Sequence, residues 1–315
     1  MLARTGSLSR NLAFRLIAPR KNFEPHKALI ICADPRGGST WLYEILSNID
    51  RTVGLWEPLD IGRAKLFREI GFNYRQYIPE AASNTEAWQA FNALFRGQCL
   101  EEHVMQKASL REYQNADTLL VKFCRGTQLL PWLSREFAFK RYPVHLIRHP
   151  CAVVASQLRY GAWDHVTPGF EEDDVLSDPL KAPHAECLLK ITTIEERLAA
   201  YWALVNAIAL NHPKRRDKWL TVAYEHLVLD PKQLVSSVLE KWQLEIDDID
   251  ACLQNPSQTA LQSSPVVNGK RIEQLAYWQK TLSTQQIDLI LETTRKIGVT
   301  IYDTNSAPRN SGPFI

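Results

Sequence analysis

The sequence predicts an α/β fold, a three-layer sandwich with a mostly parallel central sheet and helices on both faces. Short apolar runs without polar alternation are typical of strands buried on both faces. Segments with helical spacing follow these runs, and this alternation favours parallel pairing. The 315 residues suffice for one large domain of this class or two small ones. The four apolar runs are 27–33, 118–124, 143–148 and 219–223.

The first half of the chain contains three of these strands. The run 27–33 leads into a turn-rich loop, Asp34–Thr40, and then into a helix over Trp41–Leu46. Residues 61–115 hold aromatic and charged side chains at irregular helical periods, so this region favours helix. The strands at 118–124 and 143–148 follow.

The second half adds the last strand and the longer helices. Pro150 opens a helix over Ala152–Leu158. Residues 161–185 contain Gly, Pro and an acidic run, and 255–270 are rich in Ser, Pro, Asn and Gly, so both predict loops. The other predicted helices are Ile194–Leu210, Pro231–Trp242 and Thr284–Ile297, the last capped by Ser283.

We expect a basic N-terminal segment, 1–25, a domain over 26–305 and a tail, 306–315. No acidic residue occurs before Glu24, and the basic residues there alternate with Ser and Leu. This pattern is typical of an organellar targeting segment, an amphipathic surface helix or a basic tail. No run of about eighteen apolar residues occurs, so we predict no transmembrane helix. The scattered, unpaired cysteines predict a cytoplasmic protein.

Composition argues against several classes of function. Lys and Arg number 37 and Asp and Glu 35, so the net charge of +2 gives no broad basic surface for nucleic acid. The six cysteines are scattered without a CxxC pair, which predicts reduced, mostly buried thiols. Cys and His do not cluster as zinc ligands do, so no metal is expected. His145 and His149, at the end of an apolar run, are interpreted as structural.

The loop Pro35–Thr40 has the composition of an anion site. Its glycines let the backbone approach a ligand closely, and the N–H groups at the start of the next helix favour negative charge. Arg36 adds a forked cation suited to phosphate or sulfate oxygens, while Ser39 and Thr40 add hydroxyl donors. The ATP-binding P-loop has Lys where this loop has Ser39, which argues against ATP. An ordinary turn before a helix has a similar composition.

Two further segments carry candidate ligand groups at the ends of predicted strands. Arg148 ends one strand, where open α/β sheets bind ligands, and Ser156 lies about two helical turns further on. Together they could bind one phosphate through charge-assisted hydrogen bonds. Tyr224 follows another strand and, like Trp41, offers an aromatic face to a base. Core packing explains either aromatic residue equally well.

These three segments, in this order, resemble those of sulfotransferases that use 3′-phosphoadenosine 5′-phosphosulfate (PAPS). Pro35-Arg-Gly-Gly-Ser-Thr-Trp41 resembles the family's 5′-phosphosulfate loop, and Arg148-x-Pro150 with Ser156 its 3′-phosphate site. Tyr224-Glu-x-Leu227-x-x-Asp230-Pro231 resembles the segment that touches adenine. The likeness covers about residues 26–300. It implies a P-loop-like fold, PAPS as co-substrate, adenosine 3′,5′-bisphosphate as product, and no metal.

The resemblance implies a role for each matching residue. Arg36, Gly37, Gly38, Ser39, Thr40 and Trp41 would hold the phosphosulfate end, Arg148 and Ser156 the 3′-phosphate, and Tyr224 the base. The family's late Arg-Lys-Gly loop has only Asn268-Gly-Lys-Arg271 as a counterpart, from which Lys270 and Arg271 are carried over.

Two departures concern the catalytic centre. The cytosolic small-molecule branch has Lys in place of Arg36 and a catalytic His in place of Cys124. The Arg loop is more similar to the protein-tyrosine and some bacterial branches, in which a Glu after the first helix looks like the base. This implies Glu57 as general base, with His165 as the second candidate. Lys122 would support the leaving group or line the acceptor cleft.

Sulfuryl transfer resembles phosphoryl transfer, which depends on in-line positioning and electrostatic stabilisation. Arg36 would neutralise charge on the bridging oxygen, and a hydroxyl acceptor needs a base within hydrogen-bond reach. Two alternatives stay open: a non-catalytic protein that binds PAPS or the bisphosphate, and a P-loop phosphotransferase that binds ATP with Mg²⁺. The aromatic residues of 54–115 and 160–190 are compatible with a cleft for a small-molecule, carbohydrate or lipid acceptor, and equally with a helical core. The sequence leaves the oligomeric state open.

Overall fold

The computed structural model describes residues 21–161, 167–254, 271–309 and 314. Its centre is a five-stranded sheet of order β2-β3-β1-β4-β5, in which every neighbouring pair is parallel. The predicted α/β architecture with a parallel sheet is therefore confirmed. The strands are β1 (Leu29–Ala33), β2 (Thr52–Trp56), β3 (Thr118–Phe123), β4 (Val144–Ile147) and β5 (Leu220–Ala223).

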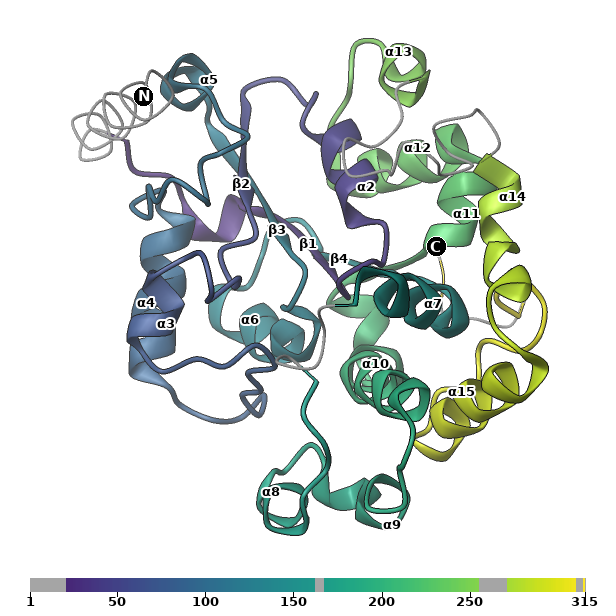
Figure 1. Ribbon diagram of the computed structural model, residues 1–315. Coiled ribbons are helices and arrows are strands. Elements are labelled where there is room, and N and C mark those ends of the chain that lie inside the picture. The colour runs from purple at the N-terminus through teal and green to yellow at the C-terminus, as the bar shows by residue number, and fades with distance from the viewer. Residues whose placement is uncertain (1–20, 162–166, 255–270, 310–313, 315) are drawn as a thin grey trace, which may run out of the picture.

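Alternate residues of the central strand enter two separate cores. Ile30 belongs to a core that includes residues of α4 (Thr85–Phe95) and α6 (Leu130–Phe137). Ile31 belongs to the opposite core, which includes α2 (Ser39–Leu46) and α12 (Pro231–Trp242). Because apolar side chains cover both faces, the strands lack polar alternation. Figure 1 shows the sheet between these two groups of helices.

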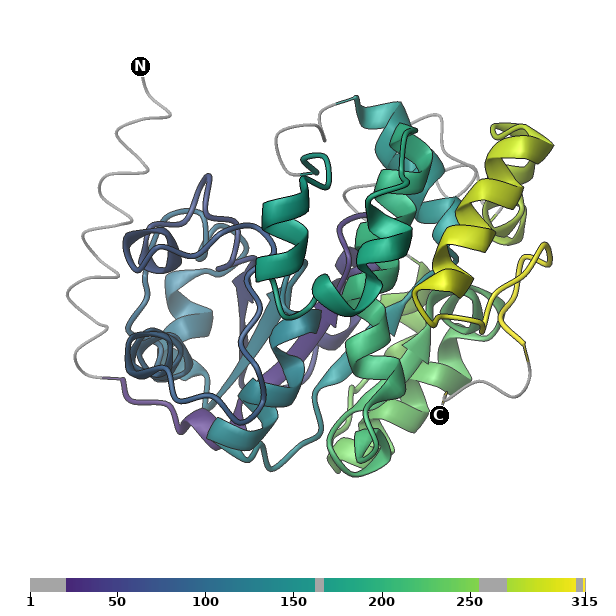
Figure 2. The same cartoon turned by 90° about the horizontal axis from the view of Figure 1, so that it is seen from below.

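A group of helices packs beside β4 and β5. It contains α7 (Pro150–Tyr160), α10 (Ile194–Asn211) and α15 (Thr284–Lys296), which contact one another. Figure 2 shows the yellow α15 beside the teal and green helices. Ser283 caps α15 as predicted, in a box with Gln286 that satisfies two backbone N–H groups.

The sequence-based prediction missed β2 and misread part of the region 161–185. β2 is one of the two edge strands of the sheet, and its pattern is interrupted by the partly exposed Gly54, which packs against Tyr43. The acidic run, predicted as loop, contributes to α8 (Glu172–Ser177), because acidic side chains in a first turn favour the helix dipole. The remaining α-helices are α3 (Leu66–Glu69), α5 (Leu110–Asn115), α9 (Ala185–Leu188), α11 (Tyr224–Leu229), α13 (Ile249–Gln254) and α14 (Arg271–Leu275).

The carboxyl ends of all five strands meet at one edge of the sheet. In the sheet, β2 and β3 lie on one side of β1, and the later strands β4 and β5 lie on its other side. Such a reversal of strand order opens a crevice at the carboxyl ends, where α/β proteins bind ligands. Among the described residues, no helix is both long and apolar enough to span a bilayer. The residues that follow the strands in turn include Arg36, Glu57, Cys124, Arg148 and Tyr224.

Candidate active site

The loop between β1 and α2 forms a tight backbone turn at this edge. Gly37 donates its N–H to the carbonyl of Asp34 at 2.9 Å. Arg36 and Gly38 both have left-handed backbones, with φ of 72° and 91°. Gly38 is the N-cap of α2, and no side chain caps the first N–H groups of the helix. A helix start of this kind attracts anions.

Two arginines from different elements meet beside the loop. The Nε of Arg36 donates to Ser156 Oγ at 3.0 Å, and its guanidinium lies 4.1 Å from the ring centre of Tyr160. Arg148 Nη1 donates to the carbonyl of Arg36 at 3.1 Å. Burial lowers the pKa of Arg36, and the neighbouring charge of Arg148 adds to this effect. The predicted pair Arg148 and Ser156 is thus brought together around Arg36.

Arg148 also carries a buried donor that the described residues leave unsatisfied. Its Nε is enclosed and has no hydrogen-bond partner among them. Buried polar atoms in proteins are nearly always paired, so an orphaned cationic donor indicates a missing anion or water.

Tyr224 supports the loop through its ring. A Cβ at position 38 would overlap the Tyr224 ring, so residue 38 must be glycine for steric as well as conformational reasons. The guanidinium of Arg148 lies 4.6 Å from the ring centre of Tyr224, and the Tyr224 hydroxyl donates to Gln274 Oε1 at 3.1 Å. The ring is only 5% exposed. Its contact with a base stays a prediction.

Glu57, directly after β2, belongs to a polar chain that reaches the start of α2. Its Oε1 accepts from Lys122 Nζ at 2.6 Å and from Cys124 Sγ at 3.2 Å. Cys124 Sγ in turn lies 3.4 Å from Ser39 Oγ. Burial, followed by the charge of Glu57, raises the pKa of Cys124 to about 11, so the thiol keeps its proton. Since that proton goes to Glu57, the Ser39 hydroxyl donates to the sulfur.

The carboxyl group of Glu57 is ionised. Burial alone would raise its pKa, but the charge and hydrogen bond of Lys122, with the bond from Cys124, hold the pKa below its ordinary value. Lys122 is 1% exposed, and its Nζ also lies 3.5 Å from the ring centre of Trp56. Glu57 has a left-handed φ of 43°, a strained value that its N–H bond to the Lys122 carbonyl at 3.0 Å helps to hold.

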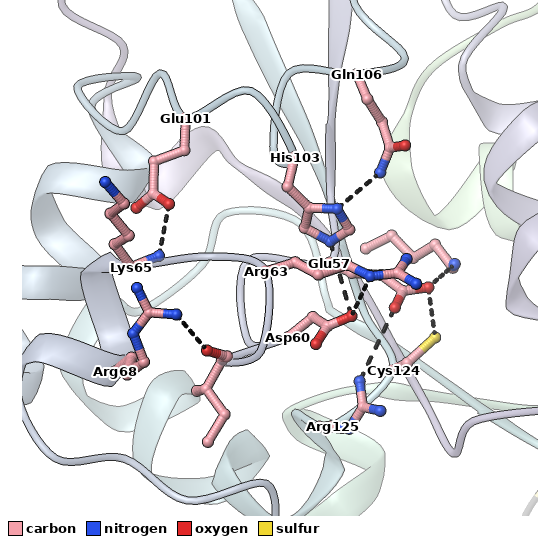
Figure 3. Close-up of polar contacts among 12 residues, drawn as sticks. Glu57, Asp60, Arg63, Lys65, Arg68, Glu101, His103, Gln106, Cys124 and Arg125 are labelled. Carbon is pink, nitrogen blue, oxygen red and sulfur yellow. Dashed lines mark hydrogen bonds and ion pairs between the residues drawn. The ribbon is translucent and has the colours of Figure 1, made fainter. Parts of the chain in front are cut away.

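Further charged groups surround Glu57, as Figure 3 shows. Arg125 Nη1 lies 4.0 Å from Glu57 Oε2. His103 Nε2 lies 3.9 Å from Asp60 Oδ2, and Gln106 Nε2 donates to His103 Nδ1 at 3.1 Å. Burial lowers the pKa of His103 although Asp60 and Glu57 oppose it, so the ring is neutral with its proton on Nε2. That buried Nε2 has no hydrogen-bond partner in the described part of the chain.

A family model described as "Sulfotransferase family" matches residues 28–248, which include the loop, Glu57, Arg148 and Tyr224. The chain belongs to the sulfotransferase family. The P-loop-like fold expected from the sequence is confirmed with it.

Two solved structures are similar to this sulfotransferase-family chain. One is the sulfotransferase domain of the Synechococcus PCC 7002 olefin synthase, with 19% identity and a TM-score of 0.48 over 90% of this chain and 96% of that chain. The other is the sulfotransferase domain from the curacin biosynthetic pathway, with 18% identity and a TM-score of 0.48 over 86% and 95%. No curated protein matches the sequence significantly.

Several predicted site residues lie away from this centre or outside the description. His165 and Lys270 fall outside the described residues, and Arg271 begins α14 without a described side chain. Trp41 is 5% exposed and its side chain belongs to the core around α2 and α12, so it presents no open ring face. Their predicted roles stay predictions. Across the described ranges, no group of three or more His, Cys, Asp or Glu side chains is arranged to hold a metal ion.

The structural interpretation of His145 and His149 is confirmed. Both are fully buried, and burial lowers the pKa of each to about 4. His145 Nε2 lies 2.9 Å from Asn206 Oδ1. His149 Nδ1 accepts from the N–H of Cys151 at 3.2 Å, and its ring stacks on Trp278 at 4.5 Å. These contacts join β4 to α10 and to the C-terminal part of the domain.

The sequence analysis missed four polar groups of the site. Arg125 could have been found, because it directly follows Cys124, the last residue of a predicted strand. Asp60, Arg75 and His103 lie in irregular segments that match no motif. Only the folded chain brings His103 to Asp60 and Arg75 to Arg125.

Proposed function

We propose that this chain transfers the sulfuryl group of PAPS to a hydroxyl group of an acceptor, with Glu57 as the general base. One observation carries the proposal. An ionised carboxylate, Glu57, connects through Cys124 and Ser39 to the start of α2, the helix whose preceding loop contains Arg36. A proton acceptor and an anion site therefore lie at the same helix start.

The residues present fit PAPS. The buried, unpartnered Nε of Arg148 calls for an anionic oxygen or a water molecule, and Gly38 lets the Tyr224 ring pack directly against the loop. Guanidinium groups match the geometry of sulfate and phosphate oxygens. The residues that would hold the phosphosulfate are Arg36, Gly37, Gly38, Ser39 and Thr40, those for the 3′-phosphate are Arg148 and Ser156, and Tyr224 would contact the base.

Each group at the centre has one part in the reaction. Glu57 removes the proton of the acceptor hydroxyl while the hydroxyl oxygen forms a bond to sulfur. At the same time, the bond between sulfur and the bridging oxygen of the donor breaks. Arg36 and the first N–H groups of α2 stabilise the charge left on the departing bisphosphate. Lys122 keeps Glu57 ionised, and Cys124, which already holds a proton, only orients it. PAPS, when bound, supplies the sulfuryl group.

Calorimetry with adenosine 3′,5′-bisphosphate and adenosine 5′-monophosphate tests the donor site. We expect Arg148→Ala to weaken bisphosphate binding about tenfold or more, the scale of a lost charge-assisted hydrogen bond, and monophosphate binding less than about threefold. Arg159→Ala, which removes a neighbouring arginine that stacks on Tyr277, serves as the matched control. Equal losses for both nucleotides would reassign Arg148 to a structural role.

Transfer itself is tested with PAPS labelled in its sulfuryl group. The purified chain is mixed with a metabolite extract, and mass spectrometry identifies the labelled product. If the wild-type protein binds no bisphosphate at millimolar concentration, or binds it without labelling any acceptor, the proposed transfer is wrong.

A further inference from the structure

The crevice contains a second pair of stacked arginines, next to Asp34 and Pro35 at the start of the donor loop. In the donor site, Arg36 lies over Tyr160 and Arg148 over Tyr224. In the second pair, the guanidinium of Arg75 lies 4.1 Å from the ring centre of Tyr201. That of Arg125 lies 4.7 Å from the ring centre of Tyr74. Stacking occupies the guanidinium face and orients the N–H edge, which is the part that binds a carboxylate through two hydrogen bonds.

These two arginines line a pocket that reaches Cys124, a hydrogen-bond partner of Glu57. Its narrow inner part has the size of one water molecule, about 10 Å³, and is lined by residues that include Asp34, Arg75, Cys124 and Arg125. Tyr74, Arg75 and Val205 also line a wider outer part of about 360 Å³. The inner part reaches Cys124, which donates to Glu57.

The outer part is large enough for a small organic ligand, and most of its walls are apolar or aromatic. Its lining residues include Ile61, Phe72, Tyr74, Leu180, Tyr201, Leu204 and Val205. Lys181 and Asp178, which also line it, form an ion pair at 3.0 Å and so neutralise each other.

Three cations and two carboxyl groups lie at the inner part of this pocket or in the neighbouring pair of Glu57 and Lys122. Arg75, Arg125 and Lys122 are cations, whereas only Asp34 and Glu57 are carboxyl groups. Lys122 pairs with Glu57 at 2.6 Å, while Arg125 lies 4.0 Å from it. Burial raises the pKa of Asp34 to about 6, although Arg75 acts against this shift. An anionic ligand would balance the excess.

We propose that the acceptor is a hydroxyl compound with an apolar or aromatic body and one carboxylate, which Arg75 and Arg125 bind. The inference rests on the proposed function, because that function places the acceptor hydroxyl at Glu57. It goes further by assigning the chemical class of the acceptor.

Calorimetry with two matched pairs of probes tests the anion site without any turnover. The pairs are 3-(4-hydroxyphenyl)propanoate with its amide and 8-hydroxyoctanoate with its amide, each titrated with and without adenosine 3′,5′-bisphosphate. We expect at least one carboxylate to bind about tenfold or more tightly than its amide. Arg125→Gln and Arg75→Gln should reduce this ratio to about threefold or less. Arg159→Gln, another arginine stacked on a tyrosine, should leave the ratio unchanged.

The outcomes separate the two proposals. If each carboxylate binds no better than its amide, or if Arg125→Gln leaves the preference intact, the anion site is wrong even though the bisphosphate binds. Failure of every carboxylate to bind at millimolar concentration also overturns it. A carboxylate preference in a protein that binds no bisphosphate supports the anion site and contradicts the proposed transfer. Arg125 is 16% exposed, so its variant remains informative if the more enclosed Arg75 variant does not fold.

Discussion

The donor side and the acceptor side of the crevice are built in different ways. The proposed donor groups lie in three continuous segments, each directly after a strand. The proposed acceptor side is assembled from single side chains, such as Arg75, Arg125 and Tyr201, that lie far apart in sequence. A nucleotide site of this kind leaves a motif in the sequence, because turn geometry dictates the residues. A side-chain pocket leaves none.

Glu57 joins the two sides, so its substitution should give the largest effect. We expect Glu57→Gln to lower kcat by about a hundredfold or more, the usual scale for loss of a general base. The dissociation constant of adenosine 3′,5′-bisphosphate should stay nearly unchanged. The amide has nearly the same shape as the carboxylate and stays in contact with Lys122 and Cys124. Steady-state kinetics and calorimetry on the same sample measure both quantities.

The exposed Glu240→Gln in α12 is the matched control for this substitution and should leave kcat unaltered. A Glu57→Gln enzyme with wild-type kcat would remove Glu57 from the chemistry. Equal losses in kcat and nucleotide affinity would instead make Glu57 part of the donor side, and the division between the two sides would fail.

The same division explains how much could be predicted from the sequence. The four strands with continuous apolar runs were found, because both of their faces are buried. The edge strand β2 was missed, since its partly exposed Thr52 and Gly54 interrupt the pattern. Arg36 and Arg148 could be placed at one site because strand ends converge in a parallel sheet.

The acceptor side could not be derived in that way. The positions of Arg75 and Tyr201 relative to each other depend on how α10 packs beside the irregular segment that carries Arg75, and no local spacing encodes this. The aromatic residues of 54–115 were proposed as an acceptor cleft or a helical core. In the structure Phe67 and Phe91 form core, while Tyr74 lines the pocket.

Gly38 provides an intermediate test, directed at the donor side alone. Gly38→Ala should weaken bisphosphate binding about tenfold, because the new Cβ overlaps the Tyr224 ring and displaces the N–H groups at the start of α2. Gly71→Ala is the control, since Gly71 has a similar φ of 78° with open space around its Cβ position. It should lose only about 1 kcal/mol of stability and no nucleotide affinity. Similar affinity losses in both variants would show that strain, and not the Tyr224 contact, matters.

Stability should fall in mild acid because of two buried histidines on the donor side. His145 and His149 have pKa values of about 4 when folded, below the value near 6.5 of an unfolded chain. The unfolded state therefore binds protons first, so their contribution to stability is complete above about pH 6.5 and is lost as the pH falls towards 4. Denaturant midpoints measured across this range should decrease with acidity.

The smallest expected effect concerns the pH dependence of the reaction. Because the pKa of Glu57 lies below 4.5, the base is ionised throughout the neutral range, and kcat at saturating acceptor should change less than about twofold between about pH 8 and 5.5. A histidine base such as His165, with an ordinary pKa near 6.5, would lose about tenfold over the same interval. Circular dichroism at each pH separates loss of the fold, driven by His145 and His149, from protonation of the base. A tenfold fall in kcat with the fold intact would move the proton acceptor from the carboxylate after β2 to a histidine.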